Sequence, residues 1–190
     1  MLTHCCISEK KLFNKFYALL AHRLIKENAQ SFKYSYKYTL WDYLKSLSNL
    51  DVHQISNLAK LTAFLLSHLD IPLHFLKVID FDPDNEEEPL SVSQAPVALF
   101  LHVLFEDLIS TCSADAVSKV LRLGIPEEQA AFGKGLCQYL LTTFYKRMKK
   151  QNHDKIPKEL EEKLQKLFDV IKEKQQNEFV ASSIRDRFKM

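Results

Sequence analysis

The chain has 190 residues, of which 46% are hydrophobic and 26% are charged, and its formal net charge at pH 7 is +2. This composition is typical of an ordinary soluble globular protein, and no apolar run reaches the roughly 20 residues that a membrane-spanning helix needs. Three glycines in the whole chain disfavour sheets joined by tight turns and favour helices.

The first predicted helix runs from Ser8 to Glu27, where apolar residues recur at helical spacing after a suitable N-cap. The next stretch, from Phe32 to Leu47, is ambiguous. Its aromatic residues alternate with polar ones as in a strand, but they also fall on one helical stripe. A lone strand would leave its backbone groups unpaired. We therefore predict a mostly buried helix in which Trp41 anchors two layers of the fold.

Local signals predict further helices downstream. Asp51 and Gln54 form the capping-box pattern that starts a helix. The segment from Val97 to Ile109 is apolar on nearly every face, which predicts a central buried helix. Gly124 is interpreted as the C′ residue that stops a helix. Other helices are predicted to begin near Pro72, Ser113, Pro126 and Pro157.

The predicted fold class is all-α, with antiparallel helix pairs stacked as in HEAT-type arrays. No clean repeat period is visible, so the periodicity alone supports only the all-α class. Residues 1–150 are predicted to form the helical domain, and residues 151–190 a basic amphipathic C-terminal helix and tail.

The sequence carries no recognisable catalytic or metal-binding motif. The adjacent cysteines Cys5 and Cys6 fit neither a disulfide framework nor a metal knuckle, and the seven histidines are scattered along the chain. Gly133, Lys134 and Gly135 look like part of a phosphate loop but lack its full spacing and lie in a helical pattern. We therefore expect no enzymatic activity, no metal or other cofactor and no small-molecule substrate.

One segment of the chain is strongly acidic and has no basic residue. It is either a solvated loop or a docking patch for a basic protein partner. The candidate partner-binding residues are Asp80, Asp82, Asp84, Glu86, Glu87 and Glu88.

A second segment is strongly basic, at the end of the helix predicted from Pro126. Its side chains could contact RNA phosphates. They could also be a solvated helix end, since lysine and arginine favour the C-terminus of a helix dipole. The candidate RNA-binding residues are Lys146, Arg147, Lys149 and Lys150.

Four short motifs, in order, resemble the MA-3 domain. The resemblance is strongest to the version at the C-terminus of nucleolar proteins that also carry a middle domain of translation initiation factor 4 gamma. In that comparison this chain is expected to begin partway through the module and to lack the middle domain. The motifs are Phe16-Tyr17, Trp41-Asp42, Asn57-Leu58 with Leu61, and the segment from Leu76 to Phe81.

The resemblance implies a HEAT-like module without catalytic activity that binds proteins, in several relatives a DEAD-box RNA helicase of the initiation factor 4A class. It implies a nucleolar or nuclear location and a role in small-subunit ribosome biogenesis and pre-ribosomal RNA processing, among components of the pre-ribosomal particle. The motifs also resemble a spliceosomal relative. The alternative function is therefore that of an adaptor in precursor-mRNA splicing, or of an RNA-binding module. By the same resemblance Phe16, Tyr17, Trp41 and Asp42 are structural anchors.

Overall fold

Helices follow one another along the chain in the computed structural model, which describes residues 1–10, 13–82, 84–85, 87–125, 129–151, 158, 160–166, 168–170 and 173. In the described residues the backbone outside helices pairs at one isolated bridge, between Asp80 and Ser91. The predicted all-α class is confirmed. The elements are α1 (Leu2–Ile7), α2 (Lys15–Glu27), α3 (Ala29–Lys45), η1 (Leu47–Asn49), α4 (Val52–Ser67), η2 (Leu73–Val78), α5 (Ala95–Thr111), α6 (Ala114–Gly124), α7 (Ala130–Tyr139), η4 (Leu140–Phe144) and α8 (Tyr145–Gln151).

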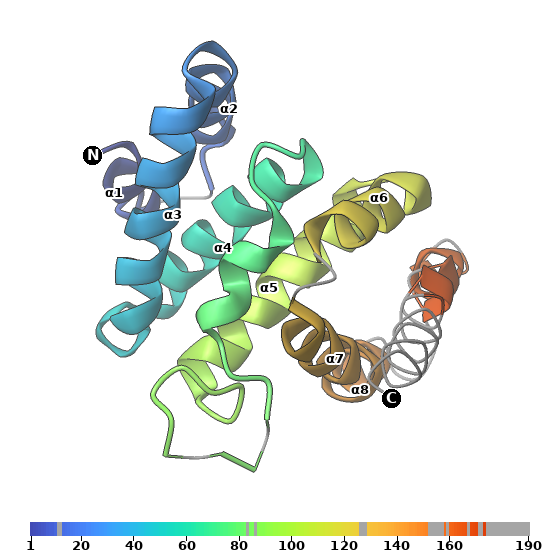
Figure 1. Ribbon diagram of the computed structural model, residues 1–190. Helices are drawn as coiled ribbons and strands as arrows, with labels where there is room; N and C mark the ends of the chain where they lie inside the picture. The colour runs from blue at the N-terminus through green and yellow to red at the C-terminus, as the bar shows by residue number, and fades with distance from the viewer. Residues whose placement is uncertain are drawn as a thin grey trace, which may run out of the picture.

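The centre of the molecule is the pair α4 and α5, which pack along each other in the middle of Figure 1. The capping box predicted at the start of α4 is confirmed: the Asp51 side chain accepts a hydrogen bond from Gln54 N at 2.8 Å, and the Gln54 side chain accepts one from Asp51 N at 3.1 Å. The predicted central helix is confirmed as α5, whose Phe100, Leu101 and Phe105 are fully buried. A helix that is apolar on most faces needs cover on several sides.

The prediction of one helix from Ser8 to Glu27 is wrong. The chain forms α1 first and restarts at Lys15, after Asn14, whose side chain accepts a hydrogen bond from the Phe16 backbone N–H at 3.0 Å. The inner face of α2 carries Ala18 and other small or medium side chains rather than its aromatic residues. Small residues allow close approach to the neighbouring helices, and helical spacing alone does not tell which of two apolar rows faces inward.

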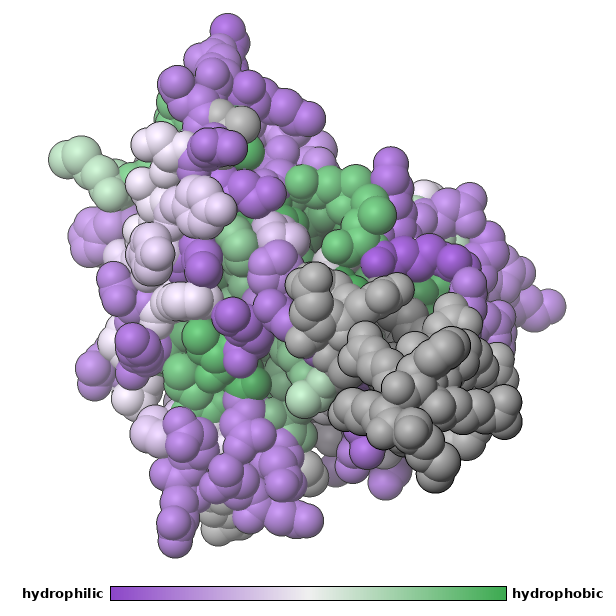
Figure 2. All heavy atoms as spheres, viewed as in Figure 1, coloured by the Kyte–Doolittle hydropathy of each residue, from purple (hydrophilic) through white to green (hydrophobic). Residues whose placement is uncertain are grey.

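The ambiguous stretch is helical, as predicted, and forms most of α3. Its buried row includes Tyr36, whose hydroxyl lies 3.0 Å from the Thr62 hydroxyl of α4. Because Thr62 donates its own proton to Leu58 O, Tyr36 donates in this pair, and burial raises its pKa. The expectation of a mostly buried helix is wrong for the other side of α3, where Tyr34 and Tyr38 are 55% and 57% exposed. Figure 2 shows residues of intermediate and low hydropathy over this helix.

The second half of the fold is α6 followed by α7, η4 and α8, which run as one continuous helix from residue 130 to residue 151. Its middle turn, η4, is a π-helix. The described residues between 158 and 173 are helical and join the same core, because Leu164 and Val170 are buried there and Phe168 lies edge-on to Tyr145 at 5.4 Å. Within the described residues, no helix has both the length and the apolar character needed to cross a membrane.

Candidate functional site

The acidic segment lies between η2 and α5. Its two ends are tied together by the backbone, since Asp80 N donates to Leu90 O and Val92 N donates to Asp80 O, both at 2.9 Å. Ser91 adds a third link by donating from its hydroxyl to Asp82 O at 3.1 Å. The described part of the loop is therefore tied to the fold at both ends.

Two of the loop's carboxylates stabilise the loop itself. Asp80 accepts from the Asp82 backbone N–H at 3.0 Å and from the Asn85 side chain at 2.7 Å. Asp82 accepts in turn from the Asp84 backbone N–H at 3.0 Å. Aspartate side chains commonly close turns in this way. These two residues thus have a structural use that the charge pattern did not indicate.

The remaining acidic side chains point to solvent. Asp84, Glu87 and Glu88 are exposed, and none of them forms an ion pair with a described lysine or arginine. The prediction for Glu86 lies outside the described residues. The exposed carboxylates can meet a cationic partner without first breaking an internal ion pair.

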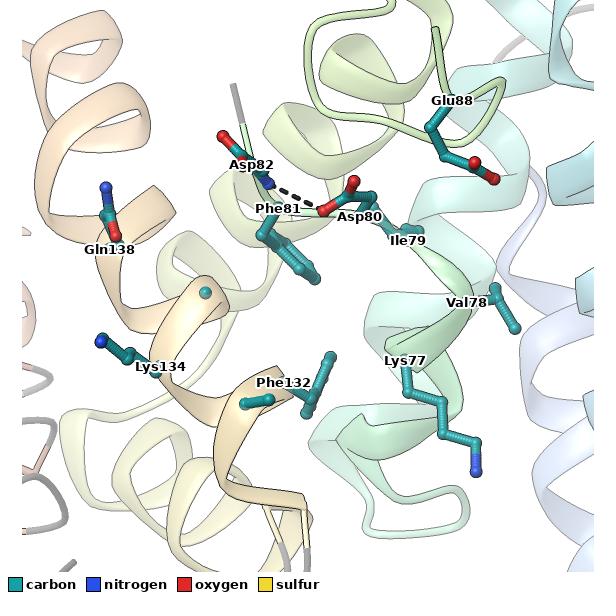
Figure 3. A pocket seen from close by; sticks show the side chains of 12 residues that line it. Lys77, Val78, Ile79, Asp80, Phe81, Asp82, Glu88, Phe132, Lys134 and Gln138 are labelled. Atoms are coloured by element: carbon teal, nitrogen blue, oxygen red, sulfur yellow. Dashed lines mark hydrogen bonds between the residues drawn. The ribbon is translucent and has the colours of Figure 1, made fainter. Parts of the chain in front are cut away.

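A groove of about 700 Å³ lies between this loop and α7. Figure 3 shows Asp80, Asp82 and Glu88 on the loop side and Lys134 with Gln138 on the α7 side. Across the described ranges, no three His, Cys, Asp or Glu side chains come together in a way that could hold a metal ion. The groove offers charge of both signs and an aromatic floor, which suits binding.

The floor of the groove is built by aromatic rings. Phe81 lies edge-on to Phe132 at 5.8 Å and to Tyr139 at 5.9 Å. α7 comes close at Gly135, where an added Cβ would lie 2.9 Å from the Phe81 Cβ. Burial raises the pKa of Tyr139 to about 12. These contacts fix the loop against α7.

The basic cluster lies on α8. Lys146, Arg147, Lys149 and Lys150 are all exposed, while Met148 between them is buried in the core. The end of this helix is tied to α5, because the Gln151 side chain contacts His102 at 3.1 Å and Glu106 at 3.2 Å. The basic side chains therefore project from a helix that is docked at its last residue.

The four expected anchor residues have different environments. Phe16, predicted as a structural anchor, is 61% exposed, and its ring lies edge-on to that of Tyr17. Tyr17 is half-buried against the core. Trp41 is half-buried and donates from its indole N–H to Phe75 O at 2.7 Å, which joins α3 to η2. Asp42 is exposed on α3.

One polar contact that fixes α2 has no local signal in the sequence. The His22 Nδ1 atom lies 2.6 Å from the Asp70 carboxylate, whose side chain is 1% exposed. The two residues are 48 positions apart, and neither belongs to a local motif, so only the tertiary structure brings them together.

Comparison with known proteins finds a family match in the N-terminal part of the chain. Residues 1–70 match the MA3 domain family model. The MA-3 resemblance is thereby confirmed over α1, α2, α3 and α4. The acidic loop and α8 lie beyond the residues that the MA3 model matches.

Curated relatives extend the similarity further along the chain. It is 32% identical over 108 residues to the human Nucleolar MIF4G domain-containing protein 1, which covers 57% of this chain and 12% of that protein. It is 32% identical over 112 residues to Suppressor of glycerol defect protein 1 of Schizosaccharomyces pombe, and this match covers 55% of this chain and 13% of that protein. It is 29% identical over 108 residues to Pre-mRNA-splicing factor cwc22 of Emericella nidulans, and this match covers 57% of this chain and 11% of that protein. The chain thus spans only a small part of these relatives.

Proposed function

We propose that this chain is a non-enzymatic protein-interaction module that acts in small-subunit ribosome biogenesis and pre-ribosomal RNA processing in the nucleolus. Its proposed partners are components of the pre-ribosomal particle, including a DEAD-box RNA helicase of the initiation factor 4A class. The MA3 match and the relative named as nucleolar support this assignment. The proposed domain division, 1–150 and 151–190, keeps the interaction surfaces on the first part.

The observation that carries the proposal is the acidic loop. It is held by backbone pairing at both ends and exposes Asp84, Glu87 and Glu88. A charged surface on a fixed backbone attracts an oppositely charged partner, and its backbone loses little conformational entropy on binding. The loop also borders the aromatic-floored groove, so a partner could place an apolar side chain beside its basic residues.

We expect the double change Glu87→Lys and Glu88→Lys to weaken capture of the partner by about tenfold or more, because like charges would face each other across the interface. The measurement is recovery of pre-ribosomal proteins on the tagged chain from nucleolar extract, and direct binding of the purified helicase. The matched control is Glu161→Lys and Glu162→Lys, which makes the same change of charge at two other exposed glutamates. Equal recovery by the two variants and the wild type would remove the loop from the proposal, and circular dichroism would verify that helix content is unchanged.

The second candidate function is RNA binding, or an adaptor role in splicing, with α8 as the contact surface. The relative named as a pre-mRNA-splicing factor supports the pathway, and the four exposed basic side chains of α8 support the chemistry. We expect Lys149→Glu and Lys150→Glu to abolish a salt-dependent affinity for structured RNA. An absence of RNA binding by the wild type at low salt would contradict this candidate.

A further inference from the structure

A surface on α3 and η2 carries aromatic and basic side chains outside the acidic loop and α8. Tyr34 and Tyr38 are exposed and lie one turn apart on α3, about 6 Å along the helix axis. Tyr38 also lies edge-on to Trp41, with ring centroids 6.0 Å apart and planes at 89°. Because Trp41 is fixed by its hydrogen bond to Phe75 O, it holds the neighbouring Tyr38 ring in place.

Lys37 lies against two of these rings, and two further lysines lie on the same two elements. The Lys37 ammonium lies 4.3 Å from the Trp41 ring centroid and 5.5 Å from that of Tyr38. Lys33 precedes it by one turn on α3, and Lys77 extends from η2. None of the three lysines forms an ion pair with a described residue. The surface therefore carries positive charge available to an anion.

Lys37 also reaches η2, since its ammonium lies 5.7 Å from the Phe75 ring centroid. Burial lowers the pKa of His74, and the nearby charges of Lys77, Lys37 and Lys33 lower it further. Charges on two separate elements therefore act on one ring. Asp42 is the exposed acidic residue at the edge of this surface on α3, and it does not offset three cations.

We propose that this face of α3 and η2 binds single-stranded RNA. Bases stack on the exposed rings of Tyr34 and Tyr38. Phosphates contact the ammonium groups of Lys33, Lys37 and Lys77. Aromatic rings beside a basic track are the arrangement that single-stranded nucleic acids use, because every base has a face that can stack.

The same surface is less suited to an acidic peptide. An acidic peptide would use the lysines but has no need of two solvent-exposed tyrosine rings in a row, whereas stacking on each ring contributes to binding of each base. The two tyrosines lie on α3, apart from α8 and the acidic loop, whereas Lys77 also lines the groove beside the loop. The tyrosine variants leave the loop and the groove unchanged, so they test this proposal independently of protein capture by the loop.

The test is a fluorescence-anisotropy titration of the full chain with a labelled oligouridylate, at several salt concentrations. We expect Tyr34→Ala with Tyr38→Ala to weaken binding by about tenfold or more, because stacking on each ring is lost. Tyr34→Phe with Tyr38→Phe keeps both rings and should bind as the wild type does. Replacing the three lysines by glutamine should reduce the slope of log affinity against log salt by about 2, since each single-strand phosphate contact contributes about 0.7.

Several outcomes would overturn this site. They are an absence of binding by the wild type at low salt, an alanine variant that binds as tightly as the wild type, or a loss of binding confined to Lys149→Glu with Lys150→Glu on α8. Tight binding of a polyglutamate peptide that the oligouridylate does not displace would also overturn it, in favour of a protein ligand. Both tyrosines are exposed, so their replacement leaves the core intact, and circular dichroism verifies this.

Discussion

Replacing Phe105 by alanine should lower the free energy of unfolding by about 3–5 kcal/mol, the range for a large aromatic truncated in a core. Phe105 is fully buried in α5. Its ring contacts two segments of the continuous helix of residues 130–151, with centroid distances of 6.4 Å to Tyr139 and 6.0 Å to Phe144. The cavity would open where α5 meets that helix. Partial collapse of the surrounding side chains would not fill it, so the cost in free energy of unfolding remains.

The measurement for Phe105→Ala is urea unfolding followed by circular dichroism. The control is Val52→Ala at the start of α4, where the side chain is 68% exposed and the change should stay within about 0.5 kcal/mol. A loss below about 1 kcal/mol for Phe105→Ala would contradict the central position of α5, since buried aromatic truncations cost several times more.

Replacing Gly124 by valine should lower the free energy of unfolding by about 3 kcal/mol, the upper end of the usual cost of overpacking. Gly124 is buried at the end of α6. A Cβ atom there would lie 2.4 Å from the Leu73 Cβ and 3.0 Å from the Leu73 backbone nitrogen. Relief would require η2 or α6 to move, because the obstacle includes backbone rather than the flexible end of a side chain.

The same unfolding experiment tests Gly124→Val, with Leu123→Ala as the neighbouring control. Leu123 is 62% exposed, so its truncation should cost no more than about 0.5 kcal/mol. If Gly124→Val unfolded at the same urea concentration as the wild type, the close contact between α6 and η2 would be wrong.

Gly124 also shows how a correct local prediction can rest on the wrong cause. From the sequence, Gly124 is predicted to be a C′ residue, a position where glycine is preferred because the backbone there is left-handed. The helix does end there, at Gly124 itself, but none of the described glycines has a positive φ. Glycine is needed at this point because Leu73 lies against it, and that neighbour is 51 positions earlier in the chain.

The acidic loop was predictable as a cluster of charge but not in its internal arrangement. The run of acidic residues predicted an exposed patch, and Asp84, Glu87 and Glu88 are exposed. Which carboxylates stay available depends on the turn that Asp80 and Asp82 close. The groove beside the loop depends on α7, which begins some 40 residues later in the chain, and a local pattern does not encode that contact.

Signals that act within a few residues were sufficient for the class of fold and for several helix starts. The capping box at Asp51, the N-cap at Ser113 and the apolar α5 each formed as predicted, because caps and amphipathic stripes act locally. The tertiary structure alone decided which side of a helix faces inward. α2 turns Phe16 outward and buries alanines, and α3 buries Tyr36 while it exposes Tyr34 and Tyr38. Side-chain spacing is the same in both orientations, and only the shape of the neighbouring helices distinguishes them.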